Sequence, residues 1–245
     1  MSSGQDPVVG HEAQWSLLYR TAGWAALLSA ALIPVQLVVF MVWGQPGSAL
    51  GWFELFRDNP VGGLLAFEFL FIFSAVAGTA LVLAFYVALR ERAPSAMSLA
   101  LVLGVVEAVA LILARPALEM LQLSQEYFAA SSESERTAFL GAGEAVRAAL
   151  NGTAFHVSYN LFSVYYLLIS LVMLRSRTFG RALPALGIAA ALLNWGLYVP
   201  GIGLFLSVLS VIPCLLVWYV LAAVRFFRRA RTPDAVAVRR MPAAS

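Results

Sequence analysis

Long apolar runs, separated by short polar segments, recur along the whole chain. A helix of about 20 apolar residues spans the hydrocarbon core of a bilayer, which is about 30 Å thick. The runs lack the regularly spaced polar positions that a helix on the surface of a soluble core shows. They predict an all-α fold, a polytopic transmembrane helix bundle. Six spans are expected, at residues 21–43, 61–89, 95–114, 154–174, 183–199 and 204–224.

Proline and glycine punctuate this pattern at three places. Pro34 and Pro213 fall inside the first and sixth spans, where each removes a backbone donor and is expected to kink its helix. The fifth span is the shortest, and it ends at the turn-forming segment Pro-Gly-Ile-Gly at residues 200–203. The fifth and sixth spans are therefore predicted to form a tight helical hairpin.

Two connections on the same side of the bundle are long enough to hold structure. Residues 44–60 are rich in aromatic and aliphatic side chains, which predicts a short interfacial helix or a re-entrant loop. In the connection 115–150, Ser132 and Glu135 have the spacing of a capping box. This spacing predicts an amphipathic, extracytoplasmic helix over residues 133–150, lying outside the bundle or across its mouth.

Composition supports a membrane protein and argues against a soluble domain and against a nucleic-acid-binding protein. Of 245 residues, 61% are hydrophobic and 12% charged, and the mean hydropathy is +0.83, whereas soluble domains have about 25% charged residues. The net charge of +3 does not indicate a nucleic-acid partner, because the positive charges lie in short clusters beside apolar runs. The single cysteine, Cys214, excludes an intramolecular disulfide.

The distribution of arginine predicts the orientation in the membrane. Arginine beside membrane spans is retained on the cytoplasmic side. Most arginines fall on one side of the six spans: Arg20, Arg90, Arg92, Arg175, Arg177, Arg181, Arg225, Arg228, Arg229, Arg231, Arg239 and Arg240. Both termini are therefore expected to be cytoplasmic, with residues 1–20 as an N-terminal segment, 21–226 as the transmembrane domain and 227–245 as a basic tail.

Ionisable and amide side chains inside the spans are rare, and each is a hypothesis about function. Glu68 lies seven residues into the second span, about 10 Å from its outer edge at 1.5 Å per residue. Glu107 lies at a similar depth in the third span, and His156 and Asn160 share one face of the fourth by their i, i+4 spacing. The candidate ligand-binding residues are Glu68, Glu107, Glu119, His156, Tyr159, Asn160 and Asn194.

These residues are expected to gather in one leaflet, as an outward-facing polar pocket. Arg115 and Glu119 would form its rim if the third span continued past Pro116. The pocket could bind a ligand or relay protons, or its polar groups could serve only as hydrogen bonds between helices. No metal site is assigned, because spacings such as HExxH are absent.

The sequence is compatible with two classes of function. The first is a non-enzymatic membrane protein that binds or moves a small or lipid-like ligand, or that partners another membrane protein or a second copy of itself. The second is a membrane-embedded enzyme that uses Glu68, Glu107 and His156, with a metal as one possibility. No cofactor can be named from the residues.

The sequence resembles a known family at the segments YRTAGWAALLSAALIP, GTAFHVSYN, LRSRTFGRALPALGIAAALLN and VPGIGLFLSVLSVIP. That family consists of bacterial six-helix integral membrane proteins and is catalogued as a domain of unknown function (4386 type). The resemblance covers residues 18–227 and implies six spans and a multi-pass location in the bacterial inner membrane. It implies no catalytic residues.

Overall fold

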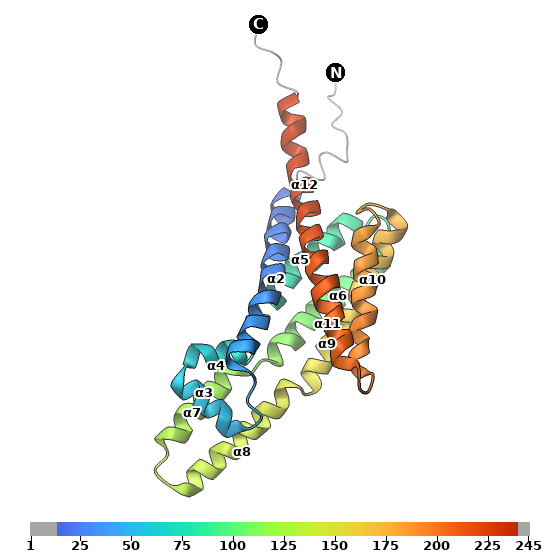
Figure 1. The fold of residues 1–245 in the computed structure, drawn as a ribbon. Helices are drawn as coiled ribbons and strands as arrows, with labels where there is room; N and C mark the ends of the chain where they lie inside the picture. Colours follow the sequence, from blue (N-terminus) through green and yellow to red (C-terminus); the bar gives the residue numbers. More distant parts are fainter. Residues whose placement is uncertain (1–13, 240–245) are drawn as a thin grey trace.

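The computed structural model describes residues 14–239, and this part of the chain is almost entirely helical and contains no strand (Figure 1). The all-α prediction is therefore confirmed. The elements in chain order are α2 (Ser16–Trp43), α3 (Ala49–Asp58), α4 (Pro60–Ala66), α5 (Leu70–Leu89), α6 (Pro94–Leu113), α7 (Ala117–Ala129), α8 (Glu133–Leu150), α9 (Thr153–Ser176), α10 (Ala182–Trp195), the 3₁₀ helix η1 (Gly196–Tyr198), α11 (Gly203–Leu209), the π-helix η2 (Ser210–Leu216) and α12 (Val217–Arg239).

Five helical segments are long and apolar enough to cross a membrane. These segments are Ser16–Trp43, Leu70–Leu89, Pro94–Ala129, Glu133–Ser176 and Gly203–Arg231. The predicted fifth span corresponds to a shorter apolar helical segment, Ala182–Tyr198. Large apolar side chains such as Trp24, Leu113 and Leu204 are exposed on the outer surface of the bundle, as expected where helices face lipid.

Small residues fill much of the bundle interior. Alanines of α2, α6, α10 and α12 are buried, and they let neighbouring helices approach closely. Aromatic rings fill the remaining space: Phe85 of α5 contacts Phe226 and Trp218 of α12, with ring centroids 4.7 and 5.4 Å apart. Helix α6 packs against α5 and α9, and α2 packs against α12. This packing defines the first of two hydrophobic cores.

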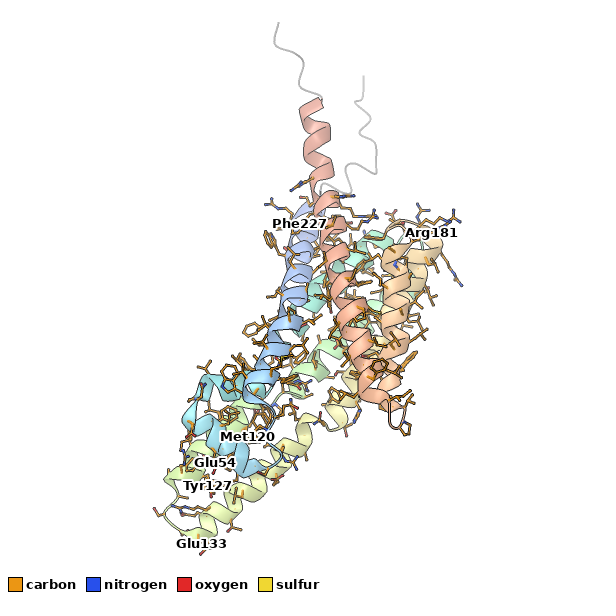
Figure 2. All side chains as sticks on the ribbon, in the orientation of Figure 1. Glu54, Met120, Tyr127, Glu133, Arg181 and Phe227 are labelled. Atoms are coloured by element: carbon orange, nitrogen blue, oxygen red, sulfur yellow. The ribbon has the colours of Figure 1, made fainter. Side chains whose placement is uncertain are left out.

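A second core lies in a group of four helices, α3, α4, α7 and α8, which we call the end module. It lies at the end of the molecule opposite the two ends of the described chain (Figure 1). Trp52, Phe53, Phe56, Phe67 and Met120 are fully buried there, and Figure 2 shows Met120 and Tyr127 far from Arg181 and Phe227. The segment 44–60, predicted as an interfacial helix or re-entrant loop, thus contributes a packed helix.

The capping box predicted at the start of α8 is confirmed. The Ser132 hydroxyl accepts a hydrogen bond from the Glu135 amide at 3.2 Å, and the Glu135 carboxylate accepts one from the Ser132 amide at 3.1 Å. The helix runs over Glu133–Leu150, the range that the sequence predicts. The Ala49 amide of α3 donates to the Glu144 carboxylate of α8 at 2.7 Å, which joins the two helices.

The range 61–89, expected as one helix, is divided in the structure. Helix α4 ends at Ala66 and α5 begins at Leu70, and between them Glu68 has φ = +65°, in the left-handed region that a helix cannot continue through. Pro34 leaves α2 continuous, whereas Pro213 falls in the π-helical segment η2. A proline cannot donate to the carbonyl four residues earlier, so the ladder of backbone hydrogen bonds changes there.

Two glycines of α8 provide a matched test of the end module. A Cβ atom at Gly143 would lie 2.6 Å from the Phe53 ring and 2.9 Å from the Ala49 Cβ, whereas a Cβ at Gly141 would have no atom within 4 Å. We expect Gly143→Ala to lower the free energy of unfolding by about 1–3 kcal/mol through overpacking. Gly141→Ala should raise it by up to about 1 kcal/mol through helix propensity. Thermal unfolding of the detergent-solubilised protein measures both, and equal shifts would contradict this packing.

Candidate functional site

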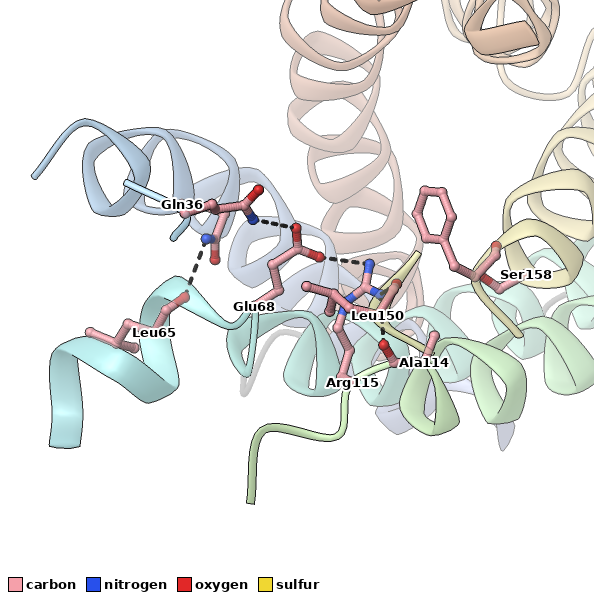
Figure 3. A network of polar contacts seen from close by, with 9 residues as sticks. Gln36, Leu65, Glu68, Ala114, Arg115, Leu150 and Ser158 are labelled. Atoms are coloured by element: carbon pink, nitrogen blue, oxygen red, sulfur yellow. Dashed lines mark hydrogen bonds and ion pairs between the residues drawn. The ribbon is translucent and has the colours of Figure 1, made fainter. Parts of the chain in front are cut away.

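An ion pair joins two corners of the chain, one between α4 and α5 and the other between α6 and α7 (Figure 3). Arg115 Nη2 lies 2.7 Å from Glu68 Oε2, and the two side chains are 3% and 16% exposed. The third span does not continue past Pro116 as one straight helix, because α6 ends at Leu113 and α7 begins at Ala117. Arg115 is therefore directed to Glu68 instead of forming a rim with Glu119.

Arg115 and Glu68 have further partners on both sides of the ion pair. Arg115 Nη1 donates to the carbonyl oxygens of Ala114 at 3.0 Å and Leu150 at 3.4 Å, the ends of α6 and α8. Gln45 Nε2 donates to Glu68 Oε1 at 3.1 Å. These contacts tie the bundle to the end module through one guanidinium group.

A second polar cluster, which we call the His156 cluster, consists of His156 and Asn160 of α9, Trp195 of α10 and Tyr198 of η1. Trp195 Nε1 donates to Asn160 Oδ1 at 3.1 Å, which fixes the orientation of the amide. Asn160 Nδ2 then donates to the Tyr198 hydroxyl at 2.7 Å and to the His156 carbonyl at 2.8 Å. The His156 Nδ1 atom lies 3.1 Å from the same hydroxyl.

This network holds the imidazole of His156 in place. The Tyr198 oxygen accepts a hydrogen bond from Asn160, and it has a second lone pair and its own proton. His156 Nδ1 accepts from this hydroxyl in one tautomer and donates to it in the other. In both tautomers the cluster orients the ring of an exposed histidine.

His156 and Asn160 also line an open depression of about 540 Å³ on the surface of α9. The lining residues are Gly152, Thr153, His156, Val157, Asn160 and Leu161. Polar and apolar side chains alternate along this one helix face. The depression can therefore contact a polar group and a hydrocarbon chain at once.

Two other candidates, Tyr159 and Asn194, hold helices together. The Asn194 side chain is buried and donates to the Tyr159 carbonyl at 3.1 Å and to the Ser163 hydroxyl at 2.9 Å. The Tyr159 hydroxyl lies 3.1 Å from that of Ser207 in α11. These hydrogen bonds join α9, α10 and α11. They correspond to the alternative in which the polar groups of the spans serve only as hydrogen bonds between helices.

The remaining candidates are in different surroundings. Arg115 packs 5.4 Å from the Phe155 ring centroid, and that ring lies 5.2 Å from the His156 ring, so Phe155 separates the ion pair from the His156 cluster. Glu119 is exposed on α7, and Glu107 is buried on α6. Within the described part of the chain, neither has a hydrogen bond or ion pair to the ion pair or the His156 cluster.

Sequence reasoning did not select Trp195 or Gln45 for the site. Trp195 follows Asn194 directly, and an indole N–H at the end of an apolar helix usually finds a partner, which is the signal that could have identified it. Among the described residues, no group of three or more histidine, cysteine, aspartate or glutamate side chains is arranged to hold a metal ion.

The apolar helical segments and the lipid-facing surface define a multi-pass membrane protein. Residues 21–227 match the family described as Domain of unknown function (DUF4386), and the chain belongs to that family. The resemblance drawn from the sequence is thus confirmed. No curated protein and no solved structure matches the chain.

Two carboxylate-to-amide substitutions compare how much the buried ion pair and an exposed ion pair contribute to the free energy of unfolding. Glu68→Gln leaves the Arg115 charge buried without its counter-ion, so we expect the free energy of unfolding to fall by about 3–5 kcal/mol. Asp58→Asn breaks the exposed pair with Arg57, whose side chains are 52% and 68% exposed, and should cost less than about 1 kcal/mol. Denaturant unfolding in detergent micelles compares them, and a similar loss in both would show that the buried pair has no special role.

Proposed function

We propose that the chain makes six membrane crossings, with both termini in the cytoplasm, as a multi-pass protein of the bacterial inner membrane. The two ends of the described chain lie at the same end of the bundle, which an even number of crossings requires (Figure 1). Helix α10 has 14 residues and η1 has three. Together they extend about 27 Å, close to the thickness of the hydrocarbon core.

The charges support this orientation. Arg181 lies at the end that the chain termini share, whereas Glu54 and Glu133 lie at the opposite end (Figure 2). Arginine beside membrane spans favours the cytoplasmic side. The end module is then extracytoplasmic.

We further propose that the protein binds a lipid-like ligand at the depression beside the His156 cluster. The observation that supports this most is the preorganised network, in which Trp195, Asn160 and Tyr198 orient one exposed histidine. With its proton on Nε2, the His156 ring offers an N–H donor, and together with the Thr153 hydroxyl it suits the oxygen atoms of a phosphate or carbonyl group. The open side of the depression suits hydrocarbon chains that remain in the bilayer.

An enzyme that uses His156 is less well supported. A general base is usually oriented by a second group and lies near the reacting atom. The partner of His156 Nδ1 is the Tyr198 hydroxyl, and Phe155 lies between the histidine and the Glu68–Arg115 pair. The geometry therefore favours binding over acid–base chemistry.

Single-cysteine labelling tests the topology. In a Cys214→Ser background, Ser131→Cys places a thiol between α7 and α8, and Ser95→Cys places one at the start of α6; both serines are exposed. A membrane-impermeant maleimide added to intact cells should label Ser131→Cys, while Ser95→Cys should react only after lysis. Labelling of both in intact cells, or the reverse pattern, would overturn the orientation.

Retention of added phosphatidylglycerol, measured by native mass spectrometry of the purified protein, tests the ligand proposal. His156→Ala combined with Asn160→Ala should lower the apparent affinity about 10-fold or more, because hydrogen bonds to a charged group contribute about 1.5–3 kcal/mol. Tyr198→Phe should give a smaller loss, since it removes only the hydroxyl that orients His156. Glu119→Gln, on the exposed face of α7, is the control. Equal retention by all four proteins would refute a site at this depression.

A further inference from the structure

Glu107 is a buried acid that neither polar cluster uses. It lies on the face of α6 that also buries Gly104 and Ala108, and its residue is 8% exposed. Within the part of the chain whose side chains are described, no hydrogen bond or ion pair to its carboxyl group is present. Burying an ionised carboxylate without a partner is very costly, so burial favours the neutral acid.

The helices that pack against α6 supply no counter-ion. Arg115, two helical turns further along the chain, is engaged by Glu68 and by two carbonyl groups. The ionisable side chains of α5 and α9, the helices packed against α6, are Tyr86, His156, Tyr159, Tyr165, Tyr166 and Arg175. Of these, His156 and Tyr159 are engaged with Tyr198 and Ser207, and Arg175 is exposed in the last turn of α9.

Three phenol hydroxyls are within electrostatic reach of the Glu107 carboxyl. They belong to Tyr165 and Tyr166 of α9 and to Tyr219 of α12. Tyr165 and Tyr166 are each 4% exposed. Tyr166 and Tyr219 are hydrogen-bonded to each other, and a phenol can in general donate to a carboxylate or accept from a carboxylic acid.

A small cavity lies beside two of these tyrosines. It has a volume of about 10 Å³ and is lined by residues of α5, α9 and α12, among them Gly78, Tyr165, Tyr166 and Trp218. That volume corresponds to about one water molecule. The Trp218 indole N–H is buried without a hydrogen-bond partner and lies beside Gly187 of α10.

The backbone next to the cavity is irregular. The π-helical segment η2, which contains Pro213, ends at Leu216, directly before the turn that carries Trp218 and Tyr219. Such segments inside α-helices are frequent at functional sites, and their looser hydrogen-bond ladder permits local rearrangement. Phenols, a water-sized cavity and an irregular helix therefore occur together, and the buried acid on α6 is within electrostatic reach of the phenols.

We propose that Glu107 is an intramembrane proton-binding site that exchanges its proton with water entering the cavity beside Tyr165, Tyr166 and Trp218. On release, the O–H bond of the acid breaks, the electron pair stays on the carboxylate, and the water molecule takes the proton. The proposal is independent of ligand binding at His156. The alternative is an inert neutral acid that never meets solvent.

Infrared difference spectroscopy of the full chain in phospholipid nanodiscs tests the proposal. The wild-type protein should show the carbonyl stretch of a protonated carboxylic acid at neutral pH, decreasing as the pH is raised. The band should be absent from Glu107→Gln, present but shifted in Glu107→Asp, and unchanged in the Glu119→Gln control. Absence of the band from the wild type at neutral pH, or its survival in Glu107→Gln, would overturn the assignment.

Transfer of the wild-type protein to D₂O shows whether the Glu107 proton exchanges with solvent or is buried out of its reach, and it needs no variant. A site open to water should exchange within the experiment, and its carbonyl band should move to lower frequency. A band that keeps its frequency would show that the proton is trapped, and it would overturn the proposed function of Glu107 even if the acid is neutral.

Discussion

The ion pair between Glu68 and Arg115 is a buried electrostatic contact at the junction of the two hydrophobic cores, which α2 also joins because it contributes residues to both. Each residue lies in the short connection between two helices. The last backbone carbonyl groups of a helix have no hydrogen-bond partner within that helix. Arg115 satisfies two of these, at the ends of α6 and α8, while it neutralises Glu68. Removing the partner of a buried charge is strongly destabilising, and Arg115 Nε is already buried without a hydrogen-bond partner, so the burial of Arg115 depends on Glu68 and on these carbonyl groups.

Much of the fold could be predicted from the sequence, because apolar length and helix caps are local signals. The apolar runs identify the helices of the bundle, and the Ser132–Glu135 spacing places α8 over the residues that it occupies. The division of the range 61–89 could not be predicted in this way. Residues 67–69 read Phe-Glu-Phe and continue the apolar pattern, and the break at Glu68 coincides with its pairing to Arg115, which is distant in the sequence.

The candidate site was predictable only in part. The position of a residue in its span predicts its depth in the membrane, but not which neighbouring helix its side chain meets. Glu68 and Glu107 were expected at a similar depth, yet Glu68 is paired with arginine and Glu107 is buried without an ion-pair partner among the described residues. The shared face of His156 and Asn160 follows from their spacing, and their side chains meet at Tyr198. The contributions of Trp195 and Tyr198 depend on how α10 and η1 lie against α9, which periodicity within one helix does not encode.

The two buried acids represent two ways of accommodating a carboxyl group in an apolar bundle, and the first determines the second. Glu68 engages Arg115 at one end of α6, so the arginine is not available to Glu107 two turns away. Glu107 is then left among phenols, where the neutral form avoids the cost of an isolated charge. An acid in that position can gain and lose a proton without breaking an ion pair. The ion pair at the junction of the two cores therefore also leaves Glu107 without an arginine partner and able to respond to protons.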